Sequence, residues 1–125
     1  MAKICILDAK TLGEDADFTV FDQFGEVVVY DTTSPENVVE RIQDCEIVIT
    51  NKVVLNSSNL QHAPLVKLIC VSATGTNNID LQYTQTRNIT VCNVAGYSTR
   101  SVVQHTFAML FYLLESLAYY DAYVK

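Results

Sequence analysis

The sequence has no tryptophan, only two prolines and four glycines among its 125 residues, and only eight lysines and arginines against fourteen aspartates and glutamates. So little proline and glycine excludes a collagen-like or low-complexity chain, and a hydrophobic content of 50% excludes a disordered one. The formal net charge of −6 and the scattering of the basic residues argue against nucleic acid or an anionic membrane as a partner. The composition predicts one globular domain, long enough to bury a core.

Cysteine is also sparse, and long hydrophobic runs are absent. Cys5, Cys45, Cys70 and Cys92 form no CxxC pair, and no histidine is spaced to complete a zinc site, so we expect no metal. We expect all four to be reduced, apolar core residues of a cytoplasmic protein. The most apolar stretch, 107–114, is well below the ~18 residues of a membrane span. The N-terminal apolar run is too short for a secretory signal, so we expect neither membrane insertion nor export.

Five apolar segments rich in strand-forming residues alternate with helical patterns. The predicted strands are 3–7, 26–30, 46–50, 65–71 and 89–94. They are apolar nearly throughout, which is typical of a parallel sheet covered on both faces. Right-handed crossovers then favour an α/β fold with a flavodoxin-like, doubly wound, five-stranded parallel sheet.

Cap residues predict where the intervening helices begin and end. The phenylalanines of segment 18–24 fit one face of a short helix, with Gly25 as the residue that follows its end. Ser34 followed by Pro35 predicts a helix N-terminus, and Asn56 predicts another. A further short helical pattern covers 80–87.

The C-terminal segment does not fit a closed domain. From Ser98 or Thr99 to about Val124 there is no glycine or proline, which predicts one long, protruding helix of about 25 residues, or roughly 37 Å. Apolar residues surround this helix, so it requires cover on all sides. Either a second copy or a part of the protein outside this sequence supplies that cover. We therefore divide the chain into a flavodoxin-like domain, 1–98, and a connecting helix, 99–125.

The loop after the fourth predicted strand carries the strongest local signal for a ligand. Ala73, Thr74 and Gly75 are small, so their backbone N–H groups remain accessible and can form an anion-binding nest. Open α/β sheets bind ligands beyond the carboxyl ends of their strands, where this loop lies. A small carboxylate would fit. The alternative is a plain turn in which residues 77–80 cap the next helix.

Two further residues follow strands at the same edge. Tyr97, after the fifth strand, could offer its hydroxyl or ring to a ligand, or it could simply pack the start of the long helix. Lys52, after the third strand, could add positive charge, or it could be merely solvated. His62 and His105 have no nucleophile or acid spaced to make a catalytic group, and no GxGxxG or phosphate-binding loop is present.

These loops and the long helix resemble the D-isomer-specific 2-hydroxyacid dehydrogenase family. The resemblance runs in order along essentially the whole chain, through ILDAKTLG, VVVYDTTSPE, DCEIVITNKVVL, VKLICVSATGTNNIDL and VCNVAGYSTRSVVQHTFAMLFYLLE. It implies a flavodoxin-like substrate domain followed by a Rossmann domain that binds NAD or NADP. It also implies a small 2-hydroxy or 2-oxo acid as substrate, glycerate and hydroxypyruvate being one such pair, and a homodimer formed through the C-terminal helix.

The resemblance assigns roles to individual residues. The backbone of Ala73, Thr74 and Gly75 would hold the substrate carboxylate, with Tyr97 beside the substrate and Lys52 near the mouth of the cleft. Ser101 and Val102 would approach the nicotinamide. The family's catalytic Arg, Glu and His and its glycine-rich fingerprint come later than Lys125, so no residue here is assigned a catalytic role. We expect this chain to be the substrate-binding portion of a longer enzyme, to be inactive alone, and not to bind NAD tightly.

A stand-alone binding or regulatory module, such as a receiver domain, is the alternative. A receiver needs an acidic pair after its first strand and an aspartate at the end of the third. Asp8 is present, but the third predicted strand ends in Thr50-Asn51. The sequence therefore favours the dehydrogenase.

Overall fold

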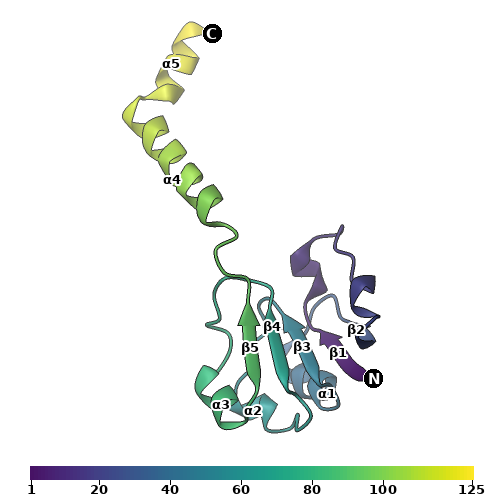
Figure 1. Ribbon diagram of the computed structural model, residues 1–125. Coiled ribbons are helices and arrows are strands. Elements are labelled where there is room, and N and C mark those ends of the chain that lie inside the picture. Colours follow the sequence, from purple (N-terminus) through teal and green to yellow (C-terminus); the bar gives the residue numbers. More distant parts are fainter. The chain divides into compact units, whose positions relative to one another are not determined.

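The computed structural model describes all residues, Met1–Lys125, and they form two units, 1–95 and 96–125. In the first unit, five parallel strands lie side by side in the order β2-β1-β3-β4-β5 (Figure 1). The strands are β1 (Ala2–Ile6), β2 (Gly25–Val29), β3 (Ile47–Thr50), β4 (Leu68–Val71) and β5 (Thr90–Asn93). The predicted flavodoxin-like order is confirmed, and each strand is slightly shorter than its predicted segment or shifted from it.

Short helices connect the strands. They are the 3₁₀ turns η1 (Ala9–Leu12), η2 (Thr19–Phe21) and η3 (Pro35–Asn37), and the helices α1 (Val38–Ile42), α2 (Ser57–Leu60) and α3 (Leu81–Thr86). The Asn56 side chain accepts a hydrogen bond from Ser58 N, as its predicted capping role requires. Ser34 makes no such bond, so only the position of that helix start was predicted correctly.

The main core fills one face of the sheet, between the strands and α1 to α3. Cys5 and Ile69 from the strands are fully buried against Ile42 of α1 and Leu60 of α2. Burying an aliphatic side chain of this size contributes about 1.5–3 kcal/mol, so this layer is the principal source of stability in the unit.

The opposite face is covered over part of its width only. Ile4, Ile6 and Ile49 are buried there under Phe18 and Phe21. This cover ends at β4, because the β5 side chains of that face are exposed. The predicted cover on both faces is therefore wrong for the β5 side of the sheet, since only short 3₁₀ turns, and no longer helix, pack on this face.

Two local expectations need correction for the same region. Segment 18–24 forms only the 3₁₀ turn η2, and Gly25 is the first residue of β2. A Cβ atom on Gly25 would lie 1.9 Å from the Ala2 backbone oxygen, so glycine is required by close strand contact, not by a helix end. Cys92 is exposed, so it is not the core residue that was predicted, because it lies on this uncovered part of the sheet.

The second unit contains α4 (Thr99–Leu114) and α5 (Leu117–Val124). The single long helix predicted here is confirmed only in part, because α4 covers 16 residues and α5 continues as a separate helix. Ser116 adopts a left-handed conformation with φ of 51°, which interrupts the helical hydrogen-bond pattern. No residue of either helix is buried. None of the helices in the structure combines the length and apolar character needed to span a bilayer.

Candidate functional site

The loops that follow β3 and β4 are hydrogen-bonded to each other at the carboxyl edge of the sheet. Ser72 N donates to Thr50 O at 2.8 Å, and Leu55 N donates to Asn78 O at 2.9 Å. The Asn78 side chain also donates through Nδ2 to Val53 O at 3.0 Å. These bonds hold the two loops in a defined relative position.

The end of β5 joins the same edge. Val94 N donates to Ala73 O at 3.0 Å, and the Asn93 side chain donates to Thr74 O at 2.6 Å. The Thr74 hydroxyl donates to Val94 O at 3.1 Å. The backbone carbonyl oxygens of Ala73 and Thr74 thus accept hydrogen bonds from within the protein.

The amides of this loop remain free. The backbone N–H groups of Ala73, Thr74 and Gly75 donate to no acceptor in the protein. Successive backbone N–H groups can converge on a negative charge, so these three unpaired donors are candidate anion-binding groups.

A pocket of about 170 Å³ lies beside this loop. Its lining residues come from the β3 and β4 loops and are Asn51, Lys52, Ala73, Gly75, Asn77 and Asn78. Pockets for drug-sized ligands have volumes of roughly 300–1,000 Å³, so this one suits a ligand of only a few heavy atoms. A small organic acid fits that limit and a dinucleotide does not.

Gly75 lines the pocket without a side chain. A Cβ atom at this position would lie 3.0 Å from Asn77 Oδ1. Few real Cβ contacts are that short, so the Asn77 amide would have to move. A larger residue at position 75 would therefore crowd the lining of the pocket.

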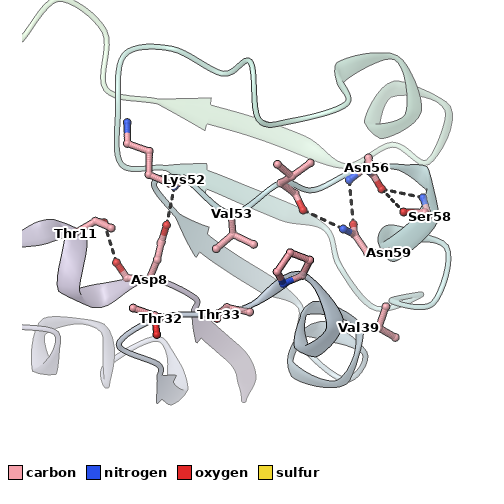
Figure 2. Close-up of a pocket in the computed structure, with 12 residues that line it drawn as sticks. Asp8, Thr11, Thr32, Thr33, Val39, Lys52, Val53, Asn56, Ser58 and Asn59 are labelled. Atoms are coloured by element: carbon pink, nitrogen blue, oxygen red, sulfur yellow. Dashed lines mark hydrogen bonds between the residues drawn. The ribbon is translucent and has the colours of Figure 1, made fainter.

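Asp8 holds the backbone of the loop after β3 in place, a role that the sequence analysis did not assign to it. Its carboxylate is buried, with 4% of the residue exposed, and accepts hydrogen bonds from Asn51 N at 2.9 Å and Lys52 N at 2.6 Å. Figure 2 shows the Lys52 side chain extending away from this anchored backbone. An acidic residue directly after a buried strand was the available signal. The partners of Asp8, 43 and 44 residues later, become apparent only in the fold.

A larger hollow of about 540 Å³ is lined by Asp8 and, like the smaller pocket, by Lys52 (Figure 2). Its polar lining groups bond mainly within the protein. Asn59 Nδ2, for example, donates to Val54 O at 2.9 Å, and the Thr33 hydroxyl donates to Leu7 O. The smaller pocket, with its free N–H groups, is therefore the better candidate for a ligand site.

The structure brings together Lys52, Ala73 and Gly75 around one pocket, and places Thr74 in the same loop. The remaining predicted residues, Tyr97, Ser101 and Val102, belong to the second unit and are exposed there. Their roles stay predictions.

The structure also shows the surroundings of the histidines, of possible metal ligands and of the acid that a receiver domain would need. His62 and His105 are both exposed. No group of three or more His, Cys, Asp or Glu side chains is arranged to hold a metal ion. The receiver alternative is not supported, because Asp8 has no acidic neighbour at the end of β1 and its buried carboxylate is bonded to two backbone amides, and because β3 ends in Thr50.

Fold and site together define an α/β domain of flavodoxin-like topology with a small pocket at the carboxyl edge of its sheet. Residues 4–120 match the family model of the D-isomer specific 2-hydroxyacid dehydrogenase catalytic domain. The chain belongs to the D-isomer-specific 2-hydroxyacid dehydrogenase family.

Two curated relatives match nearly the whole chain. Glycerate dehydrogenase of Methylorubrum extorquens is 35% identical over 124 residues, and hydroxypyruvate reductase of Blautia hydrogenotrophica is 33% identical over 126. Each alignment covers 98% of this chain but only 39% of the relative. The chain thus spans about two fifths of the length of these enzymes.

A solved structure shows the same architecture. D-lactate dehydrogenase from Aquifex aeolicus, complexed with NAD and lactic acid, superposes with a TM-score of 0.74 at 26% identity. The match covers 98% of this chain and 37% of that one.

Proposed function

We propose that this chain is the substrate-binding part of an NAD(P)-dependent D-2-hydroxyacid dehydrogenase, and that its small pocket holds the carboxylate of a 2-hydroxy or 2-oxo acid. The observation that carries this proposal is the run of three unpaired N–H groups, at Ala73, Thr74 and Gly75, beside a pocket of about 170 Å³. The parent enzyme would transfer a hydride between the nicotinamide and C2 of the acid. The names of two relatives favour glycerate and hydroxypyruvate as the substrate pair.

Each pocket residue has a physical task in this proposal. The backbone N–H groups of residues 73–75 donate hydrogen bonds to the carboxylate, and such charge-assisted bonds are stronger than neutral ones. Lys52 adds a positive charge at the pocket mouth, and Asp8 holds the Lys52 backbone in place. Family resemblance would place Tyr97 beside the substrate.

The cofactor belongs with residues outside this chain. Its four glycines, at 13, 25, 75 and 96, do not make a GxGxxG turn, and the pocket is too small for a dinucleotide. Bound NAD or NADP would supply or accept the hydride in the parent enzyme. Ser101 and Val102, in the connecting segment 99–125 that follows the proposed substrate domain 1–98, would approach the nicotinamide. We therefore expect no turnover from this chain alone.

Two further features complete the proposal. The apolar surface of α4 and α5 would form the contact between two copies in a homodimer, because all of its large apolar side chains are exposed. A cytoplasmic location agrees with four cysteines that are all free thiols.

An NMR titration of the full chain with hydroxypyruvate tests the proposed pocket. The amide signals of Ala73, Thr74 and Gly75 should shift most. Lys52→Gln should weaken binding, whereas Lys67→Gln should leave it unchanged, because Lys67 is equally an exposed lysine but lies before β4, at the opposite edge of the sheet. Shifts that avoid residues 73–75, or equal effects of the two substitutions, would contradict the assignment.

The same samples test the enzymatic part of the proposal. With hydroxypyruvate and NADH, the 125-residue chain should not change the nicotinamide absorbance. Turnover that depends on the protein would show that the chain carries its own catalytic and cofactor-binding groups, and would overturn the division of tasks proposed here.

A further inference from the structure

One row of side chains crosses the partly covered face of the sheet and ends in two cysteines. Ile6 pairs with Ile49, Ile49 with Cys70, and Cys70 with Cys92, in the register of four neighbouring strands. Exposure increases along this row, from 0% at Ile6 and 7% at Ile49 to a half-buried Cys70 and an exposed Cys92. Both cysteines are free thiols.

Register places the two thiols on the same face. Side chains of directly paired residues in neighbouring parallel strands point the same way, and the strands are roughly 4.8 Å apart. The Cβ atoms of a disulfide are about 3.5–4.5 Å apart, so a direct sulfur–sulfur bond would require β4 and β5 to approach each other. An atom bonded to both sulfurs, with bonds of about 2.3 Å as in zinc thiolates, would bridge the gap without strand movement.

We propose that Cys70 and Cys92 form a dithiol site for thiophilic ligands in which a single central atom binds two sulfurs, with trivalent arsenicals as the chemical class. In the reaction with a monosubstituted arsine oxide, two arsenic–sulfur bonds form and the arsenic–oxygen bond breaks. The two thiol protons leave with that oxygen as one water molecule. Neither arsenic nor sulfur changes oxidation state, so no oxidant or reductant is needed.

The other two cysteines do not compete for this ligand. Cys5 and Cys45 are also neighbours, but they are 0% and 1% exposed in the main core. Burial raises the pKa of the Cys5 thiol to about 12, which keeps it protonated and unreactive at neutral pH. Cys92 is the accessible thiol that meets the ligand first, and Cys70 completes the chelate from the neighbouring strand.

The dithiol lies directly before the loops of the candidate pocket. Cys92 precedes Asn93, whose side chain donates to Thr74 O, and two residues separate Cys70 from Ala73. A bridging ligand would tie β4 to the neighbouring β5 (Figure 1), just before the β4 loop that lines the pocket.

Intact-mass measurement of the full chain with phenylarsine oxide tests this site. With glutathione in excess as a competing monothiol, one arsenical should bind per chain, with the loss of one water molecule, and dithiothreitol should remove it. Cys92→Ser should weaken binding by roughly 100-fold or more, because the second sulfur no longer binds intramolecularly. Cys70→Ser should do the same.

Cys45→Ala is the matched control, because it removes a thiol from the buried pair and should leave binding unchanged. Cys92 is exposed, so the Cys92→Ser chain should fold and the test does not depend on the half-buried Cys70. Tight binding that survives Cys92→Ser, that is lost in Cys45→Ala, or that is absent from the unaltered chain would overturn the proposal.

Discussion

At the residue scale, a single buried carboxylate connects the first strand to the candidate site. Asp8 bonds to the backbone of Asn51 and Lys52, so removing it leaves two partly buried N–H donors without an acceptor. Asp8→Ala should lower the free energy of unfolding by about 1–3 kcal/mol, measured by urea denaturation. Glu14→Gln, at an exposed position, serves as control and should stay within about 0.5 kcal/mol of the parent. Equal midpoints for the two variants would show that Asp8 is not an anchor.

The four thiols should differ widely in reactivity. Burial raises the pKa of Cys70, with the nearby Cys92 adding to the effect, and burial also raises the pKa values of Cys5 and Cys45. A raised pKa means less thiolate at neutral pH, and the thiolate is the reactive form. Iodoacetamide should therefore alkylate Cys92 first, Cys70 later and the buried pair last, as followed by peptide mass spectrometry. Labelling of Cys5 before Cys70 in the folded chain would contradict this order.

Several site residues were predictable because they follow strands directly. Ala73, Gly75 and Lys52 come just after β4 or β3, and the carboxyl ends of parallel strands meet at one edge. Asp8 also follows its strand, but its task depends on amides 43 and 44 residues away. No spacing rule predicts that contact.

At the element scale, two helix starts that look alike in sequence differ in what their side chains do. The Asp80 side chain accepts a hydrogen bond from Tyr83 N at 2.9 Å and caps α3. Ser34 caps nothing, and its side chain instead interacts with the Glu36 carboxyl and lowers the pKa of that group. Asp80→Ala should destabilise the fold by about 0.5–2 kcal/mol in thermal or urea unfolding.

Ser34→Ala is the comparison for that measurement. It should change stability by less than about 0.5 kcal/mol, because no helix N–H group loses its acceptor. If Ser34→Ala were as damaging as Asp80→Ala, the side-chain positions at the start of η3 would be wrong.

Strands were easier to predict than helices. Each short apolar run contained one strand, because a buried parallel strand leaves a continuous hydrophobic pattern. Segment 18–24 has helical spacing but forms only η2: Phe18 and Phe21 pack on the sheet, whereas Phe24 is exposed. In the C-terminal segment the left-handed Ser116 ends α4, and neither glycine nor proline marks that point.

At the scale of the whole molecule, the side chains of α4 and α5 form the main apolar surface that no other part of the chain covers. Phe107 is 52% exposed and its ring centroid lies 6.2 Å from that of Phe111. If this surface joins two copies, Phe107→Glu removes apolar burial worth about 1.5–3 kcal/mol in each copy. The dimer should then dissociate at least roughly tenfold more readily, as measured by sedimentation equilibrium.

Gln104→Glu adds the same charge to the same helix at a position that is polar already, and it should leave the association constant nearly unchanged. A parent chain that stays monomeric at high concentration with α4 helical would remove the basis for the proposed homodimer.

The sequence by itself determined the class of fold, its five parallel strands and the small-residue loop of the candidate site. These follow from local hydrophobic patterns and from the rule that ligands bind at the carboxyl edge of such sheets. Only the tertiary structure decided that Asp8 anchors the Lys52 loop, that the β5 side of one sheet face is uncovered, and that Cys70 and Cys92 are neighbours. Those features depend on contacts between residues 22 to 44 positions apart, which chain topology creates and local patterns do not contain.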